Sequence, residues 1–225
     1  MRTALKYIVT RTYKPLLVKY LSRTRLFRYQ DIRLEIPPTV FHPGFFSSTL
    51  LLLKQIDNLP LDKKSVLELG AGSGLIAMVA AKKGAEATAT DINPVAVDYL
   101  HRNSDENKIQ LEIIRSNLFS GIPAKKFDII AINPPYYRKQ PQTWYDHAWY
   151  CGENGEYFSG LFSQLDGYMH ESTVVLVVLC DGCDREMIGT AARQNGFELR
   201  LLLTKQNMLE KNFIYKIERN NARLI

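Results

Sequence analysis

The sequence has few cysteines, no long apolar run and no repeat, and each absence excludes a class of protein. Three cysteines, Cys151, Cys180 and Cys183, occur in 225 residues, too few and too unevenly spaced for a disulfide framework. The longest apolar runs, such as residues 174–180, fall well short of the roughly 18 to 20 residues that span a bilayer. The N-terminus lacks the apolar core of a signal peptide. We therefore expect a protein of the cytoplasm with no membrane partner.

The pair Cys180 and Cys183 has the spacing of a redox or metal pair. It closes a predicted strand, however, and no second pair of ligands lies at the spacing of a zinc site. We predict no metal site and no redox role.

Acidic residues are nearly absent from the first 33 positions. This stretch holds nine Lys or Arg and one acidic residue, Asp31, so its local charge is +8 in a chain whose total is +6. The basic charge therefore belongs to an N-terminal extension, residues 1–40, which we expect to be helical and then extended, ahead of a domain over residues 41–225. An electrostatic arm for RNA or the ribosome and a solvated helical face remain equally open.

From residue 65 onward, apolar strands alternate with helical segments. Such alternation predicts βαβ crossovers and an α/β fold with a doubly wound, mostly parallel sheet, whose ligand lies at the carboxyl ends of the strands. Upstream, residues 28–40 look extended, and Ser47 to Thr49 form a plausible N-cap for a helix over residues 50–56. The seven expected strands are 65–69, 86–91, 111–115, 127–132, 173–180, 197–203 and 212–218, the last two as a hairpin, and the expected helices are 75–83, 94–107, 156–169 and 185–194.

A glycine-rich segment, residues 68–74, joins the first strand of this series to its helix. Glycines permit a tight turn and close approach of the backbone to a ligand, and the helix N-terminus exposes free N–H groups. Asp91 ends the next strand, where an acidic side chain can accept hydrogen bonds from ribose hydroxyls. A nicotinamide dinucleotide would use the same geometry, although Leu75 stands where G-x-G-x-x-G has its last glycine. Glu68 and Asp91 can also be read as helix or loop caps.

Asn133-Pro134-Pro135-Tyr136 follows the apolar strand 127–132. Two consecutive prolines remove two backbone donors and fix two φ angles, so the strand stops there and leaves a stiff loop with unpaired carbonyls. A side-chain amide, a free carbonyl and an aromatic face suit a flat substrate group that carries N–H donors. A mere strand terminator would leave Asn133 and the glycine loop unexplained.

With these motifs in this order, the chain resembles class I methyltransferases that use S-adenosylmethionine and carry an N-P-P-Y motif. Over roughly residues 40–218 it is similar to the small-domain methyltransferases and to the catalytic half of the release-factor glutamine methyltransferases. The resemblance implies S-adenosylmethionine as cofactor and Asn117 where the family commonly has Asp. The cofactor-binding residues that it implies are Glu68, Gly70, Ala71, Gly72, Gly74, Asp91, Ile92, Asn117, Leu118 and Asn133.

The same resemblance implies transfer of a methyl group to an amide or exocyclic amine nitrogen. Asn133 and the Pro134 carbonyl would accept hydrogen bonds from the two N–H groups of the substrate, and Tyr136 would pack on its flat face. The reaction would need no covalent intermediate and no metal. Asp128 is more easily read as satisfying backbone groups, and His42 and His147 as surface or structural residues. The implied substrate-binding residues are Phe45, Phe46, Pro135, Tyr136 and Tyr137.

Two substrates remain open at this point. Residues 148–155 resemble the segment after N-P-P-Y in the release-factor enzymes, which favours a glutamine of a protein of the translation machinery. The basic extension instead suits RNA, with a base flipped into an aromatic pocket. A third hypothesis is a catalytically silent cofactor-binding module that docks to a nucleoprotein, against which the intact N-P-P-Y argues. The sequence carries no signal for an oligomeric state.

Overall fold

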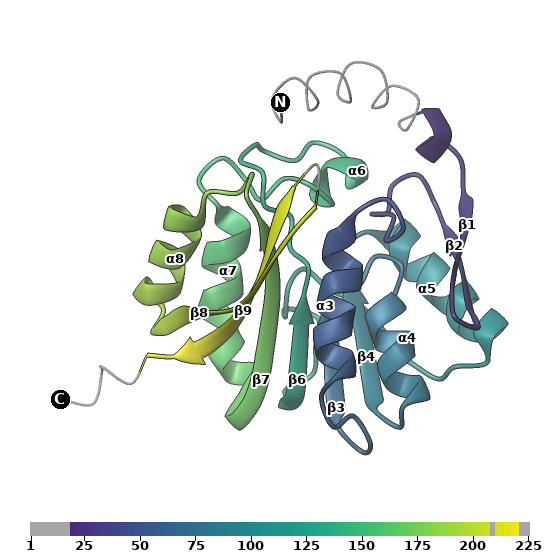
Figure 1. Ribbon diagram of the computed structural model, residues 1–225, viewed down its shortest axis with the longest axis horizontal. Helices are drawn as coiled ribbons and strands as arrows, with labels where there is room; N and C mark the ends of the chain where they lie inside the picture. The colour runs from purple at the N-terminus through teal and green to yellow at the C-terminus, as the bar shows by residue number, and fades with distance from the viewer. Residues whose placement is uncertain (1–18, 208–209, 221–225) are drawn as a thin grey trace.

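A seven-stranded sheet forms the centre of the molecule, with the strand order β5-β4-β3-β6-β7-β9-β8 (Figure 1). The computed structural model describes residues 19–207 and 210–220. The five strands from β5 to β7 in this order run parallel to one another. Strand β9 is antiparallel to both of its neighbours, β7 and β8. The predicted doubly wound, mostly parallel sheet is confirmed. Its strands are β3 (Ser65–Leu69), β4 (Glu86–Asp91), β5 (Glu112–Arg115), β6 (Phe127–Ile132), β7 (Met169–Cys180), β8 (Phe197–Gln206) and β9 (Lys211–Arg219).

Helices cover both faces of the sheet (Figure 1). On one face lie α3 (Ser47–Asp57), α4 (Leu75–Lys82) and α5 (Pro94–Asn107), and on the other lie α7 (Glu156–Leu165) and α8 (Arg185–Gln194). Two short elements, α6 (Trp144–His147) and the 3-10 helix η2 (Asp166–Tyr168), complete this part of the chain. Helix α6 was not predicted from the sequence.

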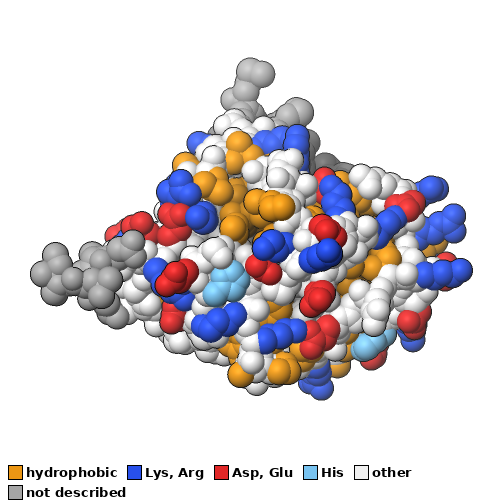
Figure 2. All heavy atoms as spheres, turned by 90° about the horizontal axis from the view of Figure 1, so that it is seen from below, with side chains coloured by type: hydrophobic (Ala, Val, Ile, Leu, Met, Phe, Trp, Pro, Cys, Tyr) orange, Lys and Arg blue, Asp and Glu red, His pale blue; other side chains and the backbone are white. Residues whose placement is uncertain are grey.

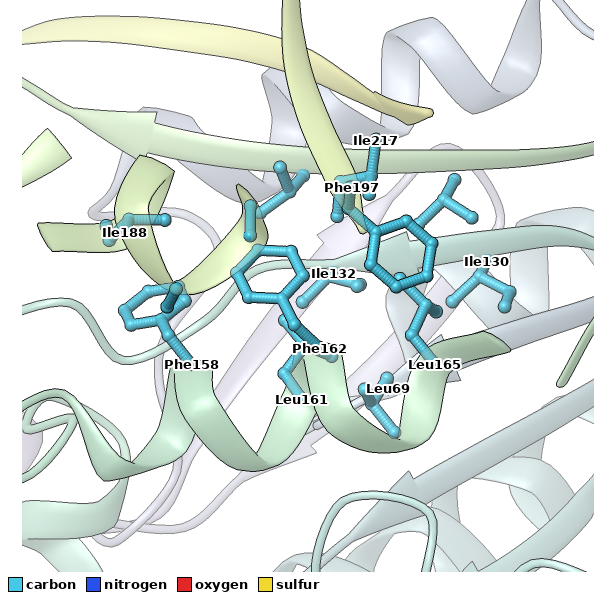
Figure 3. Packing of buried hydrophobic residues seen from close by; sticks show 14 of the residues in the cluster. Leu69, Ile130, Ile132, Phe158, Leu161, Phe162, Leu165, Ile188, Phe197 and Ile217 are labelled. Atoms are coloured by element: carbon cyan, nitrogen blue, oxygen red, sulfur yellow. The ribbon is translucent and has the colours of Figure 1, made fainter. Parts of the chain in front are cut away.

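Alternation along each central strand feeds two separate cores. In β6, Ile130 and Ile132 pack into the cluster beneath α7 and α8, whereas Ile129 and Ala131 face α3 and α4. A strand buried on both faces reads as a continuous apolar run, which is why residues 127–132 were recognisable as a central parallel strand. Burying each such aliphatic side chain contributes about 1.5 to 3 kcal/mol. Figure 3 shows the α7 side chains that face this strand: Phe158, Leu161, Phe162 and Leu165.

The extended segment predicted over residues 28–40 is instead an antiparallel hairpin of β1 (Arg25–Tyr29) and β2 (Ile32–Ile36). Ile32, Leu34 and Ile36 are buried in the same core as α3 and α4. The second strand of the extension thus shares the domain's core, and the division at residue 40 stays a prediction. The helices expected near Pro15 lie outside the described residues.

The predicted N-cap over Ser47 to Thr49 is wrong. Helix α3 already begins at Ser47, and Phe46 occupies the N-cap without a side-chain hydrogen bond. The Ser47 hydroxyl donates instead to Glu210 Oε1 at 2.8 Å, and Thr49 Oγ1 accepts from the Asn133 amide at 3.0 Å. The sequence pattern assigns these hydroxyls to capping of the helix N-terminus, but in the structure they form hydrogen bonds with residues distant in the sequence.

Candidate active site

A cavity of about 510 Å³ opens at the carboxyl ends of β3, β4 and β6, where the sheet topology places a ligand. Its wall combines the glycine loop, the end of β4 and the N-P-P-Y segment. Most of the predicted site residues meet there. Those in the wall are Glu68, Gly70, Ala71, Gly72, Asp91, Ile92, Asn117, Leu118, Asn133, Pro134, Pro135 and Tyr136.

Two glycines of the loop serve different purposes. Gly70 and Gly74 have φ angles of +70° and +76°, in the left-handed region that favours glycine. A Cβ added to Gly70 would meet no atom within 4 Å, whereas one added to Gly74 would lie 2.4 Å from Leu100 Cδ2. Gly70 therefore leaves room for a ligand, while Gly74 lets α4 pack against α5. Gly74 is not part of the cavity wall.

Glu68 is a buried carboxyl group at the base of the cavity. Its Oε2 accepts a hydrogen bond of 2.7 Å from the backbone N–H of Ala77, in the first turn of α4. Gly74, the N-cap residue of α4, has no side chain with which to cap the helix. Glu68 supplies the missing acceptor from the neighbouring strand. Its removal from water raises the pKa of this carboxyl group to about 8, although the helix N–H groups act in the opposite direction.

Asp91 fixes the loop that carries the glycines. Its Oδ2 accepts from the Gly72 N–H at 2.8 Å, and its Oδ1 accepts from the Asn93 N–H at 2.9 Å. Burial raises the pKa of Asp91 above its usual range, and these backbone donors oppose that shift. Each carboxylate oxygen retains acceptor capacity, so the group can still receive hydroxyl donors from a ligand.

The turn after β5 completes this side of the cavity. Leu118 has a φ of +50°, which is uncommon for a residue with a side chain. The Ser116 hydroxyl holds this conformation, because it donates to the Leu118 carbonyl at 2.7 Å and accepts from the Gly121 N–H at 2.9 Å. The exposed Asn117 is thereby placed at the cavity wall.

The N-P-P-Y segment forms the opposite side. Asn133 Nδ2 donates to Thr49 Oγ1 at 3.0 Å, so Oδ1 is the amide atom left to accept from a ligand. Tyr136 is buried in the core beneath α7, in the same cluster as Cys180. Burial raises the pKa of the Tyr136 hydroxyl, which therefore stays protonated. The segment offers a planar surface and fixed acceptors.

Three predicted substrate-binding residues lie outside the cavity wall: Phe45, Phe46 and Tyr137. Tyr137 packs edge-on against Tyr136, with ring centroids 4.9 Å apart. Phe45 packs edge-on against Tyr20 at 5.5 Å. The role of these three residues in substrate binding stays a prediction.

An aromatic cluster that was not predicted from the sequence lies at the wall of the cavity. The ring of Phe41 lies 4.5 Å from that of Phe46 and 5.1 Å from that of Trp149, and Phe46 and Trp149 are 4.9 Å apart. Phe41 and Trp149 both line the cavity. Phe41 and Phe46 belong to the aromatic run over residues 41–46. Its partner Trp149 comes from a distant segment that the run does not reveal.

Helix α6 forms another part of the cavity wall. A capping box between Thr143 and Asp146 stabilises its single turn. Trp144 and His147 of this helix line the cavity, and the Arg115 guanidinium lies 5.9 Å from the centre of the Trp144 ring. His147 thus lines the cavity, whereas the sequence favoured a surface or structural role for it.

Two other polar residues have structural partners. Asp128 accepts from both the N–H and the hydroxyl of Ser65 at 2.9 Å and pairs with Lys64, as the sequence predicted. His42 is buried, and its Nδ1 accepts from the Gly44 N–H at 3.1 Å. Burial lowers the pKa of His42 and thus favours the neutral ring. The hydrogen bond with Gly44 stabilises the loop that contains both residues.

The three thiols are free, and burial raises their pKa values, that of Cys183 to about 12. Such thiols are poor nucleophiles and poor metal ligands, because both roles need the thiolate. Within residues 19–207 and 210–220, no three His, Cys, Asp or Glu side chains gather as a metal site requires. None of the helices in that part of the chain combines the length and the apolar character needed to cross a membrane.

Comparison with known proteins gives this geometry a family. The chain is 32% identical over 155 residues to a provisionally named protein N5-glutamine methyltransferase of Methanocaldococcus jannaschii, covering 66% of this chain and 76% of that protein. It is 36% identical over 137 residues to ribosomal RNA small subunit methyltransferase C of Haemophilus influenzae, covering 56% of this chain and 41% of that protein. Its fold matches the 16S rRNA N2 G1207 methyltransferase of T. thermophilus, solved with AdoMet and guanosine, at a TM-score of 0.61 and 18% identity, over 86% and 50% of the two chains.

The fold and the cavity define a class I methyltransferase. The chain belongs to the methyltransferase small domain family, whose profile matches residues 32–150. It is an S-adenosylmethionine-dependent enzyme. The residues present fit this cofactor, because Gly70 leaves open space at the glycine loop and Asp91 offers acceptors for a ribose. Against the ribosomal RNA enzyme the chain spans less than half of the relative's length.

Proposed function

We propose that this enzyme methylates a planar nitrogen, either of a carboxamide or of an exocyclic base amine. The observation that carries the proposal is the shared cavity. Asn133, Pro134 and Tyr136 form one wall of the space whose other wall is made by Gly70 and Asp91. A flat substrate group at the first wall would therefore face a cofactor held at the second.

The cofactor half of the site would be held mainly by backbone. Gly70 to Gly72 would border the methionine part, Asp91 would accept from the ribose hydroxyls, and Asn117 would accept from the adenine amine. S-adenosylmethionine supplies, when bound, an electrophilic methyl group on a sulfonium centre. Glu68 would contribute indirectly: its carboxyl group caps α4 and so stabilises the conformation of the glycine loop that precedes this helix.

The substrate half addresses a weak nucleophile. The lone pair of an amide or aromatic amine nitrogen is delocalised, so orientation is the main requirement. Asn133 Oδ1 and the Pro134 carbonyl would accept hydrogen bonds from the two N–H groups of the substrate. These bonds would turn the developing lone pair of the nitrogen toward the cofactor. Tyr136 would pack on the planar group. The same two acceptor dipoles would stabilise positive charge as it develops on nitrogen, and the surplus proton would leave to water.

Among the two substrate classes, we favour the glutamine amide of a protein. The M. jannaschii relative, named as a glutamine methyltransferase, matches over about three quarters of its own length. The H. influenzae relative, named for ribosomal RNA, matches over 41% of its length. An RNA base is the second candidate, supported by that identity and by the basic N-terminal residues.

Tritium transfer separates the candidates. The enzyme is incubated with S-adenosylmethionine labelled in the methyl group and an extract from cells that lack the protein. We expect the label to be released by protease, to withstand RNase, and to be absent with the Asn133→Ala enzyme. Label lost only with RNase would move the assignment to an RNA base. Absence of any Asn133-dependent label would favour a silent cofactor-binding module.

A further inference from the structure

We propose that Thr49 is a positioning residue for methyl transfer: its hydroxyl oxygen holds the Asn133 amide so that Oδ1 faces the substrate nitrogen. The inference rests on the proposed N-methyl transfer and extends it. The resemblance to known families assigns a role to Asn133 but none to Thr49. The two residues are 84 positions apart in the sequence.

The contact holds the amide in one orientation, with Nδ2 toward Thr49 and Oδ1 free. The terminal torsion of an asparagine is broad, so a half-turn exchanges the Oδ1 acceptor with the Nδ2 donors. The hydrogen bond of 3.0 Å from Asn133 Nδ2 to Thr49 Oγ1 occupies the donor end. Without it, the amide can turn and present N–H groups to the N–H groups of the substrate, an arrangement without a hydrogen bond. Both side chains line the cavity, and Thr49 is 7% exposed.

Thr49 is itself held in place at the start of α3. The branched Cβ of threonine limits its χ1 in a helix to two rotamers, so the position of Oγ1 is narrowly defined. The remainder of α3 is anchored in the core by Leu52, Leu53 and Ile56, each at most 1% exposed. The hydroxyl is therefore a fixed reference point beside the end of β6.

A second anchor lies at the N-terminus of α3. Ser47 Oγ donates to Glu210 Oε1 at 2.8 Å and accepts from Asn212 Nδ2 at 2.9 Å. Asn212 is 2% exposed and belongs to β9. The first turn of α3 is thus clamped between the end of β6 and the strand at the far side of β7. Such support is what a positioning residue needs, because a mobile acceptor would not fix the amide.

The test compares two substitutions at the same position. Thr49→Val removes the oxygen and keeps the shape, while Thr49→Ser keeps the oxygen. The rate of tritium transfer from saturating labelled S-adenosylmethionine to a cell extract is measured for each. We expect Thr49→Val to lower the rate about tenfold and Thr49→Ser to stay within about threefold of the wild type, since a lost buried partner typically costs this much. Equal rates for the two variants would overturn the inference.

Ser48 provides the matched control. It lies one residue earlier in the same turn, is 2% exposed, and its hydroxyl has no hydrogen-bond partner among the described residues. Ser48→Ala should leave the rate within about twofold of the wild type, because no interaction is lost. Calorimetric titration with S-adenosylhomocysteine should give the same affinity for Thr49→Val and the wild type. A weaker affinity would assign Thr49 to the cofactor side and overturn its proposed role.

A double variant separates this inference from the proposed function. If Thr49 acts through Asn133, adding Thr49→Val to Asn133→Ala should slow transfer no further. A further tenfold loss would contradict the positioning role. An Asn133→Ala enzyme of wild-type rate would instead overturn the proposed function itself. Should Thr49→Val fail to fold, Thr49→Cys against Thr49→Ser repeats the comparison with sulfur, a weak acceptor, and equal rates again count against the inference.

Discussion

The proposed cofactor half of the cavity consists of residues 68–93 and the turn after β5, and the carboxyl groups of its first segment accept hydrogen bonds from backbone N–H groups. The proposed substrate half joins residues 39–49 to residues 133–151 through contacts between side chains. A backbone-built site depends on glycines, a strand end and a helix start. A site built from side chains depends on how helices and loops that are distant in the sequence pack against one another.

The opposite end of the sheet differs from both halves. There, Lys64 pairs with Asp128 at the starts of β3 and β6, and Lys83 pairs with Asp57 at the ends of α4 and α3, so opposite charges neutralise one another. Figure 2, which views the molecule from below, shows basic and acidic side chains intermixed on that face. Exposed pairs of this kind contribute at most about 1 kcal/mol each. The buried carboxyl groups of Glu68 and Asp91 lie instead at the carboxyl ends of the strands, together with the rings of Phe41 and Trp149.

The largest effect that we expect concerns the buried Glu68. Its pKa of about 8 lies above the unfolded value of 4.5, so the native state binds the additional proton. This contribution to stability is complete below pH 4.5 and is lost as the pH rises to 8. Glu68→Gln keeps the acceptor for α4 but does not titrate. Relative to the wild type, its free energy of unfolding should rise across this window by up to about 4 kcal/mol. Urea denaturation between pH 5 and 9 measures the difference, and parallel curves would contradict it.

Asn133→Ala should have the next largest effect, and on the substrate half alone. Loss of the orienting acceptor should lower the rate of methyl transfer about a hundredfold, or about 2.7 kcal/mol of transition-state stabilisation. The affinity for S-adenosylhomocysteine should change little. Single-turnover rates with labelled cofactor and calorimetry separate the two quantities. If affinity and rate fell together, the division of the cavity into two halves would be wrong.

Asp91 tests the cofactor half. Asp91→Asn retains an acceptor oxygen and should weaken binding of S-adenosylhomocysteine about tenfold, because the charge that assists hydrogen bonds from a ribose is lost. Asp91→Ala should weaken it further and also lower stability by about 1 to 2 kcal/mol, since the N–H groups of Gly72 and Asn93 lose their acceptor. Calorimetry and thermal melting measure both effects. An unchanged affinity in Asp91→Asn would remove Asp91 from the ribose site.

Trp149 should give the smallest effect. Trp149→Leu removes one ring of the cluster with Phe41 and Phe46 and should raise the KM for the macromolecular acceptor about fivefold, in line with about 1 kcal/mol for an aromatic pair. The KM for the cofactor should not change. Tyr145→Leu is the control, because Tyr145 lies outside the cavity wall, with its ring 6.3 Å from that of Trp149. Equal effects of the two substitutions would indicate a general loss of packing.

Much of the sheet could be predicted from the sequence because local signals agree there. Strand β6 and helices α5 and α8 have the bounds that their apolar patterns and breakers indicated. The hairpin of β1 and β2 was missed. Its apolar residues pack against α3 and α4, which a local pattern does not contain. The hydroxyls of the α3 turn were misassigned for the same reason, since their partners Asn133 and Glu210 are far away in the sequence.

By itself, the sequence determined the sheet, the glycine turn and the strand-ending prolines, because backbone geometry at those positions follows from residue types and their spacing. It also placed Asp91 and Asn133 at the ends of their strands. Tertiary structure alone decided that Glu68 caps a helix, that Trp149 meets Phe41, and that Thr49 holds the Asn133 amide. These contacts arise when packed elements bring separate segments to one edge of the sheet, and no local pattern encodes that meeting.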